Sequence, residues 1–359
     1  MSRFFSEKFN RLTPYTPGEQ PQDKQYVKLN TNESPYPPSP ATVAAVTEAE
    51  LNKLNLYSDP TGRRLREALA ALYGLEVENV LLANGSDEIL SFAFMAFCDR
   101  ENPVAFPAIS YGFYPVYADL YGLEAAKVPL LPDFSVDVEA LAAKKGMIVI
   151  ANPNAPTGIA LPLDKIEYLL KSDKDRIVLV DEAYVDFGTE SALSLLPRYD
   201  NLLIVRTYSK SRSMAGARLG FAFGSREIIA DLETIRYSTN PYNLDRLALL
   251  LGEAAVKDDG YYKANCEKIA ATREASAKRL MEMGFTMTPS TANFLFVKHP
   301  SVSGGALYSG LKERGVLVRH FNKPLIRDYL RITVGTPEQM EILFFALADI
   351  LSQTAPKGV

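Results

Sequence analysis

The chain has 359 residues, of which 47% are hydrophobic and 23% charged, and its formal net charge is −4 at pH 7. These values are typical of a globular protein with two domains, or one large domain and an appendage, and they argue against nucleic acid or an anionic membrane as partner. With only two cysteines and two histidines, the chain offers neither a disulfide framework nor a Cys/His zinc site, and we expect no metal.

Residues 1–40 are rich in Pro, Asn, Thr and Ser, which predicts an irregular N-terminal arm that is ordered only where it lies on something else. The first twenty residues lack the apolar core of a secretory signal. No apolar run in the chain reaches the length needed to cross a bilayer. We therefore expect a cytoplasmic protein that binds no membrane.

Residues 41–245 alternate between helical periodicity and short apolar runs, and we expect them to form a large domain. Strands buried on both faces read as continuous apolar runs, so the pattern predicts a parallel or mostly parallel sheet of the α/β class, covered on both faces by helices. The expected helices are 62–74, 85–98 and 114–122, and the expected strands are 80–84, 103–106, 147–154, 177–184, 202–209 and 219–224.

A long helical stretch is expected to begin near Pro241, with an interdomain helix over residues 246–280. Residues 281–359 then change character and predict a smaller C-terminal domain of the α+β type. Its expected strands are 291–299, 316–321 and 330–335, and its expected helices are 304–314 and 337–352.

Polar residues follow four of the strands predicted for the large domain, in the runs 84–87, 152–154, 181–184 and 207–210. In an open α/β sheet, ligands bind beyond the carboxyl ends of the strands. We therefore expect these four runs to meet around one binding site.

Lys210 ends one of these runs, and a lysine there can pair with a carboxylate, reach solvent or react with a ligand. Asp181 follows the apolar residues "IVLV", where a carboxylate is costly to bury without a cationic partner. That partner is either the Lys210 ammonium or a protonated ring nitrogen of a ligand, and the residues alone leave both open.

The run "NGSDE" lies where a predicted strand turns into a helix. Its backbone N–H groups at Ser86 and Asp87 could bind an anion, although either side chain could instead simply cap the helix. Thr207, Ser209 and Arg218 could complete an anion site with two hydroxyls and a guanidinium; for Arg218 a surface ion pair is the alternative. A phosphate, a basic aromatic nitrogen and a carbon that reacts with lysine occur together in pyridoxal 5'-phosphate (PLP).

Eight motifs, in order, carry a resemblance that covers nearly the whole chain: "LTPYTPG", "KLNTNESPYPPS", "YSDPTGRRLREALA", "NGSDE", "NPNAPTG", "DEAYVDF", "TYSKSRSMAGARLG" and "LRITVGT". The sequence resembles fold-type I PLP enzymes of the aspartate-aminotransferase type and, among these, the histidinol-phosphate aminotransferases. The resemblance implies a seven-stranded-type, mostly parallel sheet in the large domain.

The resemblance also implies roles for individual residues. Lys210 would hold PLP covalently, Asp181 would keep the ring nitrogen protonated, and Tyr184 would donate to the ring oxygen, unless Tyr184 is an ordinary core tyrosine. Tyr111 would stack on the ring. The cofactor phosphate would be held by Ser86, Asp87, Thr207, Ser209 and Arg218, and by Tyr57 of a neighbouring subunit, which implies a homodimer with shared active sites.

One motif departs from the family. The asparagine that bonds the ring oxygen normally precedes the proline of "PTG", but this chain has Ala155 there. Asn154 is the nearest substitute, and Tyr184 alone is the other possibility.

For the substrate, the resemblance implies binding by Tyr15, Asn32, Arg319 and Arg331, with an ordinary surface role as the alternative for Arg319. The expected reaction is amino transfer from L-histidinol phosphate to 2-oxoglutarate, giving imidazole-acetol phosphate and L-glutamate in histidine biosynthesis. Two other enzymes of the same fold remain open: a PLP-dependent threonine-phosphate decarboxylase and an aromatic amino-acid aminotransferase. A non-catalytic PLP sensor is disfavoured because the fold begins within the first thirty or so residues and leaves no room before it for a DNA-binding domain.

Overall fold

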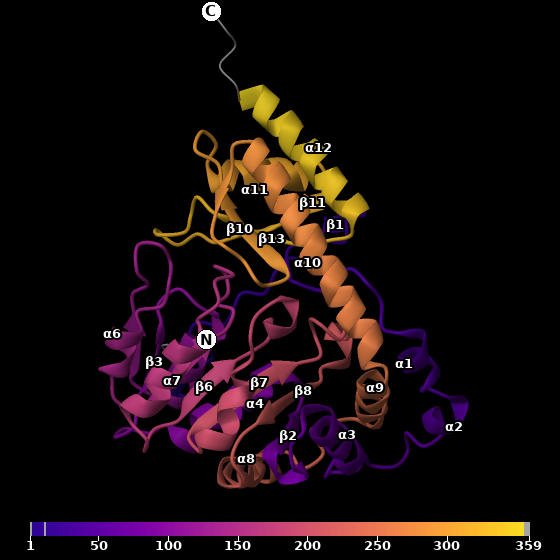
Figure 1. Ribbon diagram of the computed structural model, residues 1–359, viewed down its shortest axis with the longest axis vertical. Coiled ribbons are helices and arrows are strands. Elements are labelled where there is room, and N and C mark those ends of the chain that lie inside the picture. Colours follow the sequence, from indigo (N-terminus) through magenta and orange to yellow (C-terminus); the bar gives the residue numbers. More distant parts are fainter. Residues whose placement is uncertain (1, 11, 355–359) are drawn as a thin grey trace, which may run out of the picture.

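The computed structural model describes residues 2–10 and 12–354, and a seven-stranded sheet dominates the lower part of Figure 1. The strand order is β2-β8-β7-β6-β5-β3-β4. All neighbouring strands are parallel except β8, which is antiparallel to both β2 and β7, so the expected mostly parallel sheet is confirmed. The strands are β2 (Val80–Ala83), β3 (Val104–Pro107), β4 (Ala125–Val128), β5 (Met147–Ala151), β6 (Val178–Asp181), β7 (Leu202–Thr207) and β8 (Gly220–Phe223).

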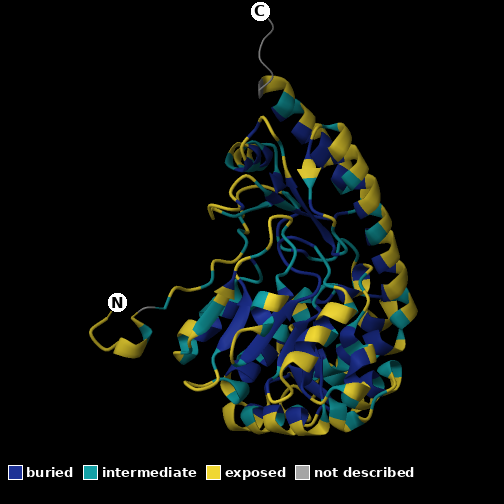
Figure 2. Ribbon diagram, turned by 60° about the vertical axis from the view of Figure 1, so that its left-hand side comes forward, coloured by how far each residue is buried: buried dark blue, intermediate teal, exposed yellow. Residues whose placement is uncertain are grey.

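Helices cover both faces of this sheet. Successive strand residues point to opposite faces, so in β2 Val80 and Leu82 join one apolar layer while Leu81 and Ala83 join the other. All strands of this sheet except the edge strand β4 are accordingly buried along their whole length (Figure 2). One layer contains α3 (Arg63–Tyr73), α6 (Val138–Ala142), α7 (Leu163–Ser172) and α9 (Arg246–Lys257), and the other α4 (Gly85–Phe97), α5 (Phe113–Tyr121) and α8 (Arg226–Thr239).

A smaller antiparallel sheet, of order β12-β13-β10-β9, has its own apolar core and lies in the upper part of Figure 1. A short parallel pair, β1 with β11, ties the N-terminal segment to this part of the fold. The elements are β1 (Val27–Lys28), β9 (Thr286–Met287), β10 (Phe294–Lys298), β11 (Val316–Leu317), β12 (Arg319–His320), β13 (Leu330–Thr333), α10 (Asp259–Glu282), α11 (Gly304–Glu313) and α12 (Pro337–Thr354).

Three local expectations need correction. The strand expected over 316–321 is two short strands in different sheets, because β11 pairs with β1 whereas β12 pairs with β13. The helical stretch expected from about residue 241 starts at Arg246 and is divided at Asp258, where α9 ends and α10 begins. The edge strand β4 was not expected, since its partly exposed residues form no apolar run.

Two short helices, α1 (Pro40–Ala44) and α2 (Glu48–Leu51), follow the N-terminal arm. Among residues 2–10 and 12–354, no helix has both the length and the apolar character that a bilayer crossing requires.

Candidate active site

Three of the four polar runs, 84–87, 181–184 and 207–210, meet around a cavity of about 280 Å³, which we call the strand-end cavity. The fourth run, 152–154, contributes no lining residue, although its neighbours Ala151 and Ala155 line the cavity. The cavity lies beyond the carboxyl ends of β5, β6 and β7, against the first turn of α4. Most of the residues expected to bind the cofactor line it. The lining residues are Thr31, Glu33, Ser86, Asp87, Tyr111, Ala151, Ala155, Asp181, Ala183, Tyr184, Thr207, Ser209, Lys210, Ala215 and Arg218.

The Lys210 amine lies on the wall of this cavity, surrounded by protein but accessible from the cavity. Its Nζ donates a hydrogen bond to the Thr31 carbonyl oxygen at 3.0 Å. Burial, assisted by the nearby Arg331 guanidinium, lowers the pKa of Lys210 to about 8. A substantial fraction of this amine is therefore neutral near physiological pH, as a nucleophile or a base must be.

Asp181 is only 5% exposed at the end of β6. Its carboxylate accepts hydrogen bonds from the Tyr114 hydroxyl at 2.9 Å and the Ala183 N–H at 3.2 Å. Burial raises the pKa of Asp181 to about 6. No ion pair joins it to Lys210 or to any other described residue, so of the two partners left open by the sequence, the lysine is excluded in this structure.

The first turn of α4 lies at the end of the cavity where the sequence predicts an anion. The helix begins at Gly85, and Asn84 is the N-cap residue without a side-chain capping bond, so the alternative that Ser86 or Asp87 caps this helix is wrong. Gly85 has a φ of +78°, and a Cβ there would lie 2.5 Å from Arg218 Nη2. A side chain at this position would therefore displace the guanidinium from the helix N-terminus.

Arg218 reaches this end of the cavity from the other side. Its guanidinium donates to the Ser209 hydroxyl at 3.4 Å and forms a half-exposed ion pair with Asp87 at 3.3 Å. Arg218 thus forms the ion pair that was its alternative role, but the pair lies within the predicted anion site and not on a remote surface. The Thr207 hydroxyl accepts from the Ser209 N–H at 3.1 Å and fixes the turn that carries Ser209.

The aromatic side chains come from two loops. Tyr111 lines the cavity and donates to the Asp87 carboxylate at 2.8 Å. Tyr184 packs edge-on against Phe294, with 5.1 Å between ring centroids, and its hydroxyl accepts a hydrogen bond from Asn32 Nδ2 at 3.0 Å. Asn32, expected to contact substrate, thus donates a hydrogen bond to a residue of the site.

Asn154 does not take the place of the missing asparagine in this structure. Its Nδ2 donates to the Ile109 carbonyl and to the Thr157 hydroxyl, both at 3.0 Å, and its Oδ1 accepts from Ser110 at 2.7 Å. These bonds use the side-chain amide to brace the loop, so that Ala155, and not Asn154, lines the strand-end cavity.

A second cavity, of about 310 Å³, adjoins the first through Tyr111 and Ala155, which line both. We call it the arm cavity because the N-terminal arm forms one wall. Arg331 lines it with its Nε buried and without a hydrogen-bond partner among the described residues, while its Nη2 donates to the Asn30 carbonyl at 3.0 Å. The other lining residues include Tyr15, Arg319 and Lys323.

Arg319 and Tyr15 are held together by the arm. Arg319 donates to the carbonyl oxygens of Thr16 at 2.8 Å and Pro17 at 2.9 Å. Tyr15 stacks on Phe113, with ring centroids 4.4 Å apart. Lys323 also lines this cavity and was not expected, because a single lysine in a short loop carries no pattern in the sequence.

Tyr57, like Asn154, is an expected cofactor contact that lines neither cavity. It is 78% exposed and stacks on Tyr242 with 4.4 Å between ring centroids. Within one chain it therefore touches no other residue of the site.

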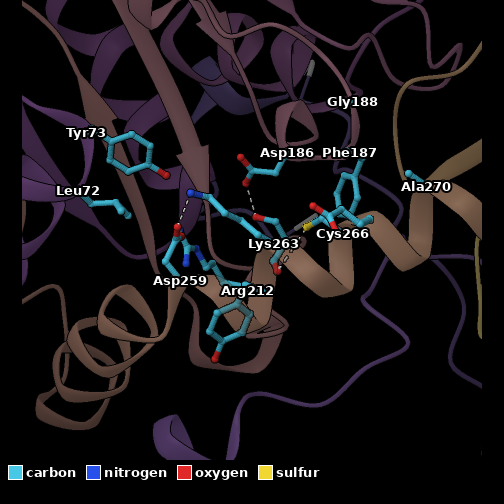
Figure 3. Close-up of a pocket in the computed structure, with 13 residues that line it drawn as sticks. Leu72, Tyr73, Asp186, Phe187, Gly188, Arg212, Asp259, Lys263, Cys266 and Ala270 are labelled. Atoms are coloured by element: carbon cyan, nitrogen blue, oxygen red, sulfur yellow. Dashed lines mark hydrogen bonds and ion pairs between the residues drawn. The ribbon is translucent and has the colours of Figure 1, made fainter.

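The loop after Lys210 is anchored on α10 beside a larger cavity of about 450 Å³ (Figure 3). Ser211 donates to Asp186, and the Arg212 guanidinium pairs with Asp259 at 2.5 Å. Lys263 pairs with the same carboxylate at 2.7 Å. The charges facing this cavity thus largely neutralise one another, and they fix the backbone that carries Lys210.

The comparisons with known proteins define the class. The chain belongs to the aminotransferase class I and II family, whose sequence model matches residues 24–347. Aminotransferases of this kind use PLP as an electron sink bound to a lysine, which confirms the predicted enzyme class and cofactor.

Two curated relatives carry a name more specific than that of the family. The chain is 51% identical to "Histidinol-phosphate aminotransferase" of Marinomonas sp., over 98% of this chain and all of that protein. It is 48% identical to "Histidinol-phosphate aminotransferase" of Brachyspira hyodysenteriae, over 95% of this chain and 97% of that protein.

Solved structures agree on the fold. A histidinol-phosphate aminotransferase from Sinorhizobium meliloti, in complex with pyridoxal-5'-phosphate, has a TM-score of 0.88 at 22% identity and covers 99% of both chains. L-threonine-O-3-phosphate decarboxylase from Porphyromonas gingivalis has a TM-score of 0.80 at 21% identity and covers 90% of this chain and 99% of that one. At such identities the likeness confirms the fold-type I architecture and does not separate the two activities.

The strand-end cavity fits PLP on its own chemistry. It offers a free helix N-terminus with an arginine for the phosphate, a buried carboxylate without a cation for a protonated ring nitrogen, and an amine of lowered pKa for the carbonyl carbon. Among the described residues the Asp181 carboxylate has no cationic partner, and a protonated ring nitrogen would supply one.

Proposed function

We propose that the protein transfers the amino group of L-histidinol phosphate to 2-oxoglutarate, with PLP held at Lys210. The observation that carries the choice of substrate is the arm cavity, where Arg331, Arg319 and Lys323 surround a space that adjoins the strand-end cavity. A cluster of cations suits a phosphate dianion better than a neutral side chain. The curated relatives at about half identity support the same substrate.

PLP supplies an electron sink that stabilises the negative charge left when the substrate carbon loses its proton. Asp181 keeps the ring nitrogen protonated in this proposal, because its buried carboxylate is stabilised by a positive partner. Tyr184 donates its hydroxyl hydrogen to the ring oxygen. Ser209, Arg218 and the first turn of α4 hold the phosphate.

Lys210 acts as the base and then as the acid. With PLP and substrate bound, the Lys210 Nζ would remove the proton from the substrate carbon that bears nitrogen and would hold that proton for its return. In the protein without PLP, burial already lowers the pKa of Lys210 to about 8, which favours the neutral form that a base requires. The Thr31 carbonyl gives the amine a fixed resting place at 3.0 Å.

Arg331 binds the anionic group of the substrate. Its buried, unpaired Nε is costly in the free protein and gains a partner when a phosphate or a carboxylate enters. A planar guanidinium serves both anions, so the same residue accepts histidinol phosphate in one half-reaction and 2-oxoglutarate in the other.

The PLP-loaded protein is therefore expected to lose the absorbance of its lysine-bound cofactor on mixing with L-histidinol phosphate, and to form glutamate when 2-oxoglutarate is added. We expect kcat/KM for phenylalanine to be lower by about 10- to 100-fold, since its singly charged carboxylate accepts fewer charged hydrogen bonds than a phosphate dianion, and each such bond is worth about 1.5–3 kcal/mol. Arg331→Gln should lower kcat/KM for both substrates, because Arg331 is the expected partner of either anion. Release of carbon dioxide from threonine phosphate would favour the decarboxylase. A kcat/KM for phenylalanine equal to that for histidinol phosphate would favour the aromatic amino-acid aminotransferase.

We also propose a homodimer in which Tyr57 completes the partner's site. Its support is a set of exposed apolar side chains near Tyr57 in the chain, on α1, α2 and the segment after them: Val43, Leu51, Leu54, Leu56 and Tyr57. The cytoplasmic location remains a prediction.

Sedimentation is expected to give a mass near twice the chain's 39.7 kDa. Mixed dimers of Lys210→Ala and Tyr57→Ala subunits should recover activity well above that of either variant, because one of the two sites then has both residues. Mixing without any recovery would contradict shared sites, whatever the mass.

A further inference from the structure

The segment Asn30–Asn32, which begins one residue after β1, contacts three side chains of the candidate active site in succession. The Asn30 carbonyl accepts from Arg331 Nη2, the Thr31 carbonyl accepts from Lys210 Nζ, and Asn32 Nδ2 donates to the Tyr184 hydroxyl, each at 3.0 Å. Only the third contact is made by a side chain of the segment, so it is the one that substitution can remove.

The side chain of Asn32 is held firmly in this orientation. Its Oδ1 accepts from the Thr333 hydroxyl at 2.9 Å, which leaves Nδ2 as the atom that faces Tyr184. Its backbone N–H donates to Thr333 Oγ1 at 2.9 Å, and its carbonyl accepts from Asn293 Nδ2 at 3.0 Å. Asn32 is 1% exposed and has a φ of 58°, a left-handed conformation that asparagine tolerates better than most residues.

This arrangement determines where the hydroxyl hydrogen of Tyr184 can go. The oxygen already accepts the hydrogen bond from Asn32, and no described residue accepts one from it. Tyr184 lines the strand-end cavity, where Ala155 contributes only a methyl group to the wall. The free hydrogen therefore points toward the cavity and whatever acceptor occupies it.

We propose that Asn32 is a positioning residue that aims the Tyr184 hydroxyl at the ring oxygen of PLP. Ala155 offers no donor, so Tyr184 supplies the side-chain hydrogen bond at this wall, and the bond from Asn32 polarises it further. The inference rests on the proposed function only in that PLP occupies the cavity; it does not depend on which amine is the substrate.

The test is the absorbance of the bound cofactor as a function of pH, without an amino substrate. Asn32→Gly removes the amide, adds no charge and suits the positive φ. The midpoint of the absorbance change is expected to rise by about one pH unit, the equivalent of one hydrogen bond of about 1–1.5 kcal/mol. The charged groups facing Lys210, namely Glu33, Asp87, Arg218 and Arg331, are unchanged in this variant.

A second variant and two controls keep the result decisive. Asn32→Asp retains the acceptor for Thr333 but loses the donor, and should also raise the midpoint if Asn32→Gly folds poorly. Asn79→Ala removes a side-chain hydrogen bond of similar length, 2.9 Å from Asn79 Nδ2 to the Gly224 carbonyl, that lies outside both cavities. This variant should leave the midpoint unchanged. In a Tyr184→Phe background, Asn32→Gly should have no further effect.

An unchanged midpoint in both Asn32 variants, or the same shift with Phe at position 184, would overturn the proposal. If the Asn32 variants raise the midpoint as expected but the wild-type protein does not act on histidinol phosphate, the role of Asn32 stands and only the proposed substrate is wrong. A protein that binds no PLP at all would overturn both.

Discussion

Lys210→Ala is expected to lower kcat for amino transfer by about 10⁴-fold or more, the contribution of a positioned acid–base group and covalent catalyst together. PLP should still bind, because Arg218, Ser209 and the first turn of α4 are untouched by the change. It should, however, no longer be attached to the chain. Borohydride reduction of the wild-type protein followed by peptide mapping measures the attachment directly.

The matched control is Lys171→Ala, which removes an exposed lysine paired with Glu167 at 3.2 Å on the outside of the large sheet. Its kcat and its labelling pattern should equal those of the wild type. Label on a peptide other than the one that contains Lys210 would show that PLP is attached to another lysine. Substantial turnover in Lys210→Ala would show that another residue moves the proton.

The sequence predicted the strand-end cavity because parallel strands bring their carboxyl ends to one edge of a sheet. Asp181 and Lys210 lie near the ends of neighbouring strands, β6 and β7, so their proximity follows from strand order once the sheet is mostly parallel. The position of Ser86 beside this cavity follows in the same way from the strand-to-helix turn between β2 and α4.

The contacts that sequence reasoning missed join segments remote in the chain or depend on local backbone geometry. Asn32 and Tyr184 are 152 residues apart, and nothing in either motif indicates that they meet. Asn154 and Ala155 are adjacent, so a small difference in loop path decides which of them faces the cavity, and the bonds to Ile109, Ser110 and Thr157 decide it.

Asp181→Asn is expected to lower kcat by about 10²–10³-fold, the usual loss when one preorganised electrostatic partner is removed. The affinity for PLP should fall much less, since the phosphate contacts remain. The amide oxygen can still accept from the Tyr114 hydroxyl, so the packing at the end of β6 is preserved. Single-turnover kinetics and a PLP titration separate the two effects, and near-normal turnover would contradict the role of Asp181.

The same substitution should stabilise the protein without PLP. The pKa of Asp181 is raised from 3.8 to about 6 by burial, so as pH rises the unfolded state loses this proton first and folding becomes less favourable. That penalty is absent below about pH 4 and complete above about pH 6, where two pKa units correspond to about 3 kcal/mol at most.

Urea unfolding of the cofactor-free proteins at pH 4 and pH 8 tests this sign. Asp181→Asn should have nearly the wild-type free energy of unfolding at the lower pH and a larger one at the higher pH. Added PLP should reduce the difference at pH 8, because its protonated ring nitrogen gives the wild-type carboxylate the partner it lacks. Equal stabilities at both pH values would mean that the carboxylate is already compensated in the free protein, and the argument for a positive ring nitrogen at Asp181 would fail.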